Sequence, residues 1–165
     1  MKNPEYWIDK LQMKPHPEGG YFKEVYRSEE SYSGEHLPER FGGDRSHSTS
    51  IYFLLVGEQV SKFHRIKSDE VWHFYEGSPV MVHRITRTGE LKSTVLGRNH
   101  DAGEQLQFAV PHGEWFGAEV NNKDSYSLVG CTVAPGFHFE DFELAERDTL
   151  QKEFPDHIDI IQRLT

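Results

Sequence analysis

The chain has 165 residues, enough to bury one hydrophobic core and short for two, so we expect a single domain over residues 1–165. Its 18 Lys and Arg against 27 Asp and Glu give a net charge of −9, which disfavours duplex nucleic acid and anionic membranes as partners. No apolar run approaches the roughly 20 residues of a spanning helix, no secretion signal is recognisable and a single cysteine excludes an internal disulfide, so we expect a soluble cytoplasmic protein.

The first predicted elements are a helix and a strand joined by a stiff turn. An Asn-Pro pair followed by one apolar stripe predicts a helix over residues 4–12. A turn rich in proline and glycine spans residues 15–20, and the alternating aromatic and charged side chains of Tyr21–Arg27 predict a strand. The hydrophilic segment Ser28–Ser48 is predicted to be a mobile surface excursion.

Eight short strands are predicted after this excursion, because runs of aromatic and β-branched residues alternate with turn residues. They are Ser50–Val56, Val60–Ile66, Glu70–Tyr75, Val80–Thr86, Leu91–Leu96, Leu106–Val110, Glu114–Glu119 and Ser125–Ala134. The stripe of Leu144, Leu150 and Phe154 then predicts a helix, and a second short helix is predicted after Pro155. Many short strands with helices only at the ends favour a mainly β fold, an antiparallel barrel of the jelly-roll type.

Residues 57–77 resemble the first motif of the cupin superfamily, in which a glycine is followed by His-x-His, a glutamate and a second glycine. His64, Glu70 and Gly77 fit its spacing, whereas Ile66 takes the place of the second histidine. The resemblance implies a double-stranded β-helix, which is the cupin form of the jelly roll.

Residues 111–116 resemble a second cupin motif, in which Pro-x-Gly is followed by a histidine. Phe116 takes the place of that histidine. Cupin metal sites use three His and one Glu, and the side chains of Ile66 and Phe116 carry no lone pair. We therefore expect no metal and no other cofactor, unless His73, His83 or His112 completes the site. Strand alternation points His73 away from the barrel interior unless a bulge intervenes.

Longer blocks resemble one branch of the superfamily, the uncharacterised DUF985 family, whose members are often labelled predicted sugar epimerases. The blocks are Pro15–Phe22, Phe63–Arg65, Ser68–Tyr75, Leu128–Phe137 and Phe139–Ala145. The resemblance implies a small, carbohydrate-like substrate and a barrel histidine that takes a proton from a carbon next to a carbonyl.

Without a metal, His64 is the candidate catalytic base, because the ordinary pKa of histidine suits proton transfer near neutral pH. Glu70 on the adjoining strand is the candidate group that hydrogen-bonds it. Candidate ligand-binding residues are Arg27, Lys62, Trp72, His73, Tyr75, Trp115 and Phe116. In a purely structural interpretation, His64 and Glu70 are a buried pair and the aromatic rings belong to the core.

The favoured function is that of a metal-independent epimerase or isomerase acting on a sugar or sugar nucleotide. The alternatives are a non-catalytic cupin that binds a small ligand and a divergent metal-dependent cupin enzyme. A homodimer is also expected, because cupins of this size pair through an edge or N-terminal strand. The long excursion lets Tyr21–Arg27 reach a second subunit at little entropic cost.

Overall fold

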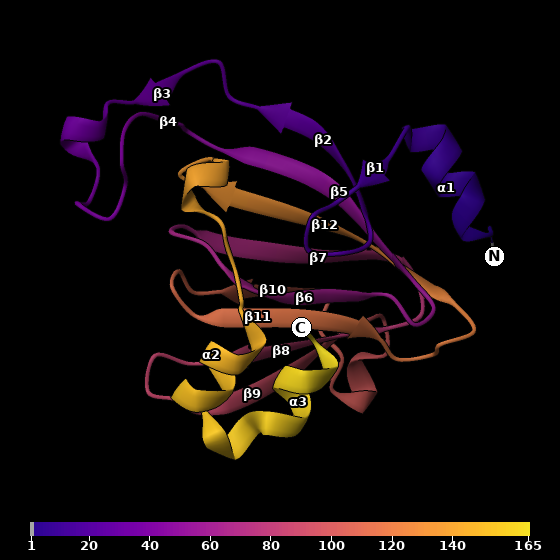
Figure 1. Ribbon diagram of the computed structural model, residues 1–165. Coiled ribbons are helices and arrows are strands. Elements are labelled where there is room, and N and C mark those ends of the chain that lie inside the picture. The colour runs from indigo at the N-terminus through magenta and orange to yellow at the C-terminus, as the bar shows by residue number, and fades with distance from the viewer. Residues whose placement is uncertain (1) are drawn as a thin grey trace.

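Two antiparallel β-sheets face each other in the computed structural model, which describes residues 2–165 (Figure 1). The strands are β1 (Lys14–Pro15), β2 (Tyr21–Arg27), β3 (Ser31–Tyr32), β4 (Arg45–Ser46), β5 (Thr49–Val56), β6 (Val60–Arg65), β7 (Asp69–Gly77), β8 (Val80–Ile85), β9 (Leu91–Leu96), β10 (Gln107–Val110), β11 (Trp115–Val120), β12 (Tyr126–Ala134) and β13 (Glu143–Leu144). Their order is β1-β2-β5-β12-β7-β10 in one sheet and β13-β6-β11-β8-β9 in the other, while β3 and β4 form a separate pair. The fold is a mainly β sandwich of the jelly-roll type, as the sequence predicted.

The helices described within residues 2–165 lie on the outside of the sandwich or in its loops. They are α1 (Pro4–Leu11), α2 (Arg147–Glu153), α3 (Ile158–Arg163) and the short 3-10 helices η1 (Gly34–His36), η2 (His100–Ala102), η3 (Phe139–Asp141) and η4 (Pro155–His157). Trp7 and Leu11 of α1 pack on the outer face of the six-stranded sheet, and Leu150 and Ile161 of α2 and α3 cover the five-stranded sheet (Figure 1). None of these helices is long and apolar enough to cross a membrane.

The main hydrophobic core lies between the sheets, because strand alternation directs every second side chain inward. Phe53 and Leu55 of β5 and Trp72 and Phe74 of β7 meet Phe116 of β11 there. These bulky rings fill the interior, which explains how a chain with only 36% hydrophobic residues can build a core.

The predicted strands match the structure to within two residues at each end, and β2 and β9 have the predicted bounds. The predicted helix containing Leu144 is wrong in its start, because α2 begins at Arg147. Glu143 and Leu144 instead form β13, which pairs with Arg65 and His64 at the edge of the five-stranded sheet. A free sheet edge offers these residues backbone hydrogen bonds that override the helical pattern.

The segment Ser28–Ser48, predicted to be a mobile excursion, contains β3, η1 and β4 and is anchored to the sandwich. Arg45 is only 3% exposed, and its Nε and Nη2 atoms donate to the two carboxylate oxygens of Asp141 at 2.6 and 2.7 Å. This buried ion pair ties the excursion to η3, which carries part of the wall of the pocket described below.

Candidate functional site

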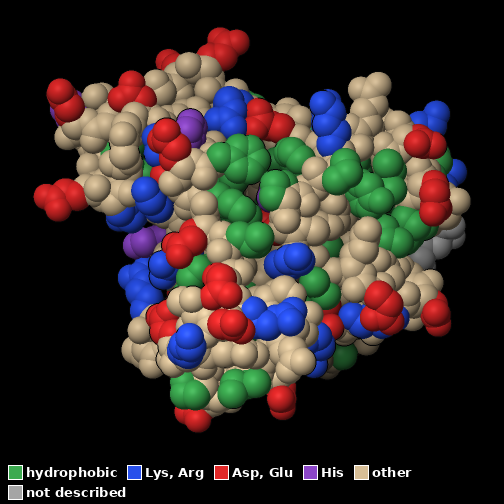
Figure 2. Space-filling model, in the orientation of Figure 1, with side chains coloured by type: hydrophobic (Ala, Val, Ile, Leu, Met, Phe, Trp, Pro, Cys, Tyr) green, Lys and Arg blue, Asp and Glu red, His purple; other side chains and the backbone are tan. Residues whose placement is uncertain are grey.

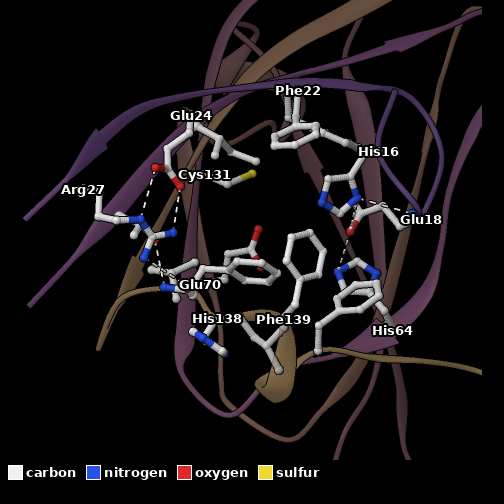
Figure 3. Close-up of a pocket in the computed structure, with 17 residues that line it drawn as sticks. His16, Glu18, Phe22, Glu24, Arg27, His64, Glu70, Cys131, His138 and Phe139 are labelled. Carbon is white, nitrogen blue, oxygen red and sulfur yellow. Dashed lines mark hydrogen bonds and ion pairs between the residues drawn. The ribbon is translucent and has the colours of Figure 1, made fainter. Parts of the chain in front are cut away.

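A pocket of about 230 Å³ opens at one end of the sandwich (Figures 2 and 3). The strands β5 and β7 begin at this end, and β6 and β12 finish there, so all four contribute to its wall. Five phenylalanines line it: Phe22, Phe53, Phe137, Phe139 and Phe142. Figure 2 shows hydrophobic side chains gathered around a hollow on this face. The polar groups of the pocket therefore act in a mostly apolar chamber.

Two histidines and one glutamate form a connected chain along one wall (Figure 3). Glu18 Oε2 lies 3.2 Å from His64 Nε2 and 3.4 Å from His16 Nδ1. Ser61 donates a hydrogen bond of 2.8 Å to the other carboxylate oxygen of Glu18. All three side chains of the chain are buried, and they join the turn before β2 to β6 of the opposite sheet.

The turn between β1 and β2 places His16 and Glu18 in the pocket because it lies directly against β6. Gly19 has a φ of +112°, and a Cβ atom there would collide with the carbonyl oxygen of Val60. Only glycine suits both the backbone angle and the close approach. The carbonyl oxygen of Glu18 accepts a hydrogen bond of 2.8 Å from the backbone N–H of Lys62, which fixes the turn on β6.

A β-bulge in β6 turns both Ser61 and His64 toward the interior, where Ser61 contacts Glu18 and His64 lines the pocket. His64 pairs with Phe116 and Ser61 with Ala118, so β6 has one residue more than β11 in this interval. Strict alternation predicted that Lys62 faces inward together with His64. That prediction is wrong because of the bulge, and the Lys62 side chain is exposed.

Burial favours the uncharged forms of both His64 and Glu18. His64 Nδ1 lies 2.7 Å from the carbonyl oxygen of Lys62, which can only accept, so Nδ1 carries a hydrogen. Burial lowers the pKa of His64 and raises the pKa of Glu18. Both directions favour the uncharged forms of the two residues, with Glu18 Oε2 3.2 Å from Nε2. Both ring nitrogens of His64 are then engaged within the protein.

His16 presents its second ring nitrogen to the pocket. Its Nδ1 accepts the backbone N–H of Glu18 at 3.3 Å, which places the hydrogen of a neutral ring on Nε2. Figure 3 shows the ring pointing into the pocket, and Nε2 has no hydrogen-bond partner within residues 2–165. Burial lowers the pKa of His16, although Glu18 acts in the opposite direction. His16 is therefore a neutral hydrogen-bond donor facing the ligand space.

Glu70 at the start of β7 supplies a carboxyl group from the six-stranded sheet, across the interior from His64 of the five-stranded sheet. It is 8% exposed, and its carboxyl forms no ion pair with any residue that the structure describes. Burial raises the pKa of Glu70 to about 7; His64 acts against this shift and Glu18 adds to it. The carboxyl thus exchanges its proton near neutral pH and faces an apolar cavity, which is the environment of a general acid or base.

Arg27 lies in the wall of the pocket, and its guanidinium is already bound. Its Nε and Nη2 atoms donate to the two carboxylate oxygens of Glu24 at 3.1 and 2.8 Å. Its Nη1 donates to Ser46 Oγ and to the carbonyl oxygen of Phe137 at 3.3 and 3.1 Å. The arginine therefore shapes this part of the pocket and carries little free positive charge.

Replacing Glu70 with glutamine is expected to flatten the dependence of stability on pH. The carboxyl ionises near 4.5 in the unfolded chain and near 7 in the folded protein, so folding stability falls as the pH rises through this interval. The variant should be more stable than the wild type at pH 8.5, by up to about 3 kcal/mol, and should lose this advantage at pH 5. Thermal unfolding of both proteins from pH 4.5 to 9 measures the difference. Parallel curves would contradict the assigned environment of Glu70.

The structure brings three of the predicted site residues, His64, Glu70 and Arg27, to one pocket. His64 and Glu70 were expected on neighbouring strands. Their strands β6 and β7 follow each other in the chain but belong to opposite sheets, so the two side chains face each other across the interior.

Three predicted ligand-binding aromatics lie in the core and not in the pocket wall. Trp72 is 1% exposed between the sheets, and Trp115 packs beneath the C-terminal helices. The Phe116 ring packs against His64, with ring centroids 4.1 Å apart and the ring planes tilted by 57°. These three side chains do not line the pocket because they fill the close-packed interior next to it.

His73 and Tyr75 point to the outer face of the six-stranded sheet, because β7 keeps its alternation and directs Glu70 inward. His73 Nε2 lies 3.2 Å from Thr132 Oγ1, and Tyr75 is 39% exposed. The two residues were predicted to bind ligand, and neither lines the pocket.

The residues that the sequence did not single out are His16, Glu18 and the phenylalanines of η3 and its flanks. His16 falls in the predicted turn over residues 15–20, where no local pattern gives it a partner. Its only signal was the block Pro15–Phe22, which belongs to the DUF985 resemblance. The pairing of Glu18 with Ser61, 43 residues away, has no local pattern.

The donor set does not fit a cupin metal site of three His and one Glu. Ile66 and Phe116 occupy two ligand positions, and His64 has both ring nitrogens engaged. His112 lies at the surface, where its Nδ1 is 3.0 Å from Asp69. Among residues 2–165, no group of three or more His, Cys, Asp or Glu side chains is arranged to hold a metal ion. We therefore derive no step through a metal.

Comparison with known proteins places this architecture in a family. Residues 5–145 match the sequence profile described as Cupin superfamily (DUF985). The chain is 30% identical over 143 residues to the uncharacterized protein YML079W of Saccharomyces cerevisiae, a match that covers 81% of this chain and 71% of that protein.

Solved structures agree with this assignment. The protein SO0799 of Shewanella oneidensis has 40% identity and a TM-score of 0.91, covering 100% of this chain and 98% of that one. A hypothetical protein of Leishmania major has 35% identity and a TM-score of 0.90, with 99% of each chain covered. Oxalate decarboxylase of Bacillus subtilis shares the fold alone, at 14% identity and a TM-score of 0.58 over 96% of this chain and 38% of that one. The chain belongs to the DUF985 family of the cupin superfamily.

Proposed function

We propose that the protein is an isomerase or epimerase of a small carbonyl compound and moves protons with its own side chains. The observation that carries the proposal is the buried carboxyl of Glu70, which forms no salt bridge within residues 2–165 and faces the same apolar pocket as the Nε2–H group of His16. A carboxyl that titrates near neutral pH together with a neutral hydrogen-bond donor is the combination needed for enolisation.

In the proposed reaction, the Glu70 carboxylate takes a proton from the carbon next to the carbonyl group. The electrons of the broken C–H bond form the enolate, whose oxygen accepts a hydrogen bond from His16 Nε2. For isomerisation of a hydroxycarbonyl compound, Glu70 returns the proton to the former carbonyl carbon, and the proton of the hydroxyl group on the neighbouring carbon moves to the enolate oxygen. For epimerisation, water delivers a proton to the opposite face of the same carbon, and the proton held by Glu70 is released to the resulting hydroxide. Atoms and charges balance without an added oxidant or reductant.

This assignment revises the role of His64. The sequence indicated His64 as the base, but its ring nitrogens contact the carbonyl oxygen of Lys62 at 2.7 Å and the Glu18 carboxyl at 3.2 Å, so both face protein groups. We assign it instead as a positioning residue, which holds Glu18 and through Glu18 orients His16.

Deuterium exchange from D₂O into candidate carbonyl compounds tests the proposal. The panel includes aldoses, ketoses, sugar nucleotides and simple ring ketones, because the family label suggests carbohydrates. We expect protein-dependent exchange at the carbon next to the carbonyl. Ligand binding without exchange would support a non-catalytic binding cupin. A stoichiometric transition metal, found by elemental analysis after purification without chelator, would support the metal-dependent alternative.

We also propose that the protein is a homodimer that pairs through β2. The strand β1 contacts only Tyr21 and Phe22, so the outer edge of the rest of β2 has no strand partner within residues 2–165. Val25 and Tyr26 on this stretch are 48% and 54% exposed. Light scattering should give twice the 19.2 kDa of one chain, and Tyr26→Asp should yield monomers. A wild-type monomer at micromolar concentration would contradict the proposal.

A further inference from the structure

We infer that the ligand of this pocket is an uncharged compound of one ring, apolar over most of its surface, with a carbonyl group at the end that meets His16 and Glu70. The inference rests on the proposed function for the carbonyl group alone. The remaining properties follow from the size, lining and charge of the pocket. They exclude sugar nucleotides and free hexoses as its ligands.

The size of the pocket limits the ligand to one ring with short substituents. A cavity of about 150 Å³ accommodates benzene, whereas drug-sized ligands need about 300–1,000 Å³. The volume of about 230 Å³ lies between these values. The base, ribose and diphosphate of a sugar nucleotide would have to remain outside it.

The lining favours an apolar ring over a hydroxyl-rich sugar. Five phenylalanines surround the space, and two of the polar groups, Glu18 and His64, are bound to each other and to the protein. Each hydroxyl group buried without a partner costs about 1–3 kcal/mol, and a hexose carries five or six of them. His16 Nε2, the Glu70 carboxyl and His138, whose Nδ1 accepts the backbone N–H of Glu140, can satisfy fewer ligand oxygens than a hexose carries.

The charges favour a neutral ligand. Three carboxyl groups line the pocket, but burial favours the uncharged form of Glu18, and Glu24 and Arg27 neutralise each other, so Glu70 carries the remaining charge above its pKa. An anionic ligand would be repelled by the ionised Glu70, because the one arginine in the pocket wall is already paired, in a protein whose net charge is −9. A cationic amine offers no acceptor for the hydrogen on His16 Nε2, whereas a carbonyl oxygen does.

A matched set of cyclohexane derivatives tests this inference. The probes are 4-methylcyclohexanone, 4-oxocyclohexanecarboxylate and 4-methylcyclohexylamine, with D-fructose and UDP-glucose as carbohydrates. Binding is measured by saturation-transfer NMR and by titration of protein chemical shifts at pH 7.5. We expect the neutral ketone to bind at least tenfold more tightly than each of the others.

Two variants distinguish charge in the pocket from charge elsewhere. Glu70→Gln removes a pocket carboxyl, so it should reduce the difference in binding affinity between the ketone and its carboxylate analogue. Glu58→Gln makes the same change at an exposed position outside the pocket and should leave this difference in affinity unchanged. Equal effects of the two variants would contradict a role for the pocket charge.

The outcomes separate this inference from the proposed function. No ketone binding at millimolar concentration, or tighter binding of the amine, the carboxylate or a carbohydrate, would overturn the inference on ligand class. Binding of the ketone without deuterium exchange at its α-carbons would uphold the ligand class and refute the proposed reaction. Exchange on a hexose or sugar nucleotide would uphold the reaction and overturn the ligand class.

Discussion

Replacing Glu70 with glutamine is expected to lower the rate of deuterium exchange into a bound carbonyl substrate by about 10²–10⁴-fold, the usual contribution of general base catalysis. Glutamine preserves the shape of the side chain but cannot accept a proton from carbon. In the wild type, exchange should rise with pH as Glu70 ionises with a pKa of about 7 and should level off above this value. Exchange followed by NMR from pH 5 to 9 measures both effects.

The same experiment distinguishes catalysis from structure. Glu58→Gln is the matched control, because it removes one exposed carboxylate outside the pocket. His16→Ala should also reduce exchange, since it removes the donor to the enolate oxygen, while leaving the carboxyl of Glu70 in place. If Glu70→Gln changed only the melting temperature and left exchange intact, Glu70 would be a structural residue and the catalytic assignment would fall.

Replacing Asp141 with alanine is expected to lower the free energy of unfolding by about 3–5 kcal/mol, the cost of leaving a buried charge without its partner. The guanidinium of Arg45 is 3% exposed and donates two hydrogen bonds to Asp141. Glu140 also lies 3.7 Å from Arg45, but its side chain is 67% exposed. Glu140→Ala should therefore cost less than about 1 kcal/mol and serves as the control. Urea unfolding at pH 7 measures both variants.

A double variant tests the origin of this loss. Arg45→Met combined with Asp141→Leu removes both charges and should recover much of the stability, because no charge remains buried without a partner. If the double variant were as unstable as Asp141→Ala, the segment would depend on other contacts. Because η3 carries Phe139 and adjoins Phe142 in the pocket wall, the affinity for ligand should fall in Asp141→Ala. It should recover in the double variant.

The sequence by itself determined the elements of this protein and the superfamily to which they belong. Alternation of apolar and polar side chains is a local property, so strands such as β2 and β9 could be bounded without knowledge of their partners. The same alternation correctly directed Glu70 inward and His73 outward on β7. The spacing of His64, Glu70 and Gly77 indicated the cupin fold, although two metal-ligand positions carry apolar residues.

Tertiary structure decided which side chains meet. A bulge of one residue in β6 reversed the expected orientation of Lys62, and nothing in the local pattern marks a bulge. The turn with His16 and Glu18 reaches the pocket because Gly19 allows it to touch β6, a contact between segments far apart in the chain. Such contacts depend on the register and packing of two whole sheets. The contacts of Glu18 with His16 and His64 therefore form only when both sheets have folded.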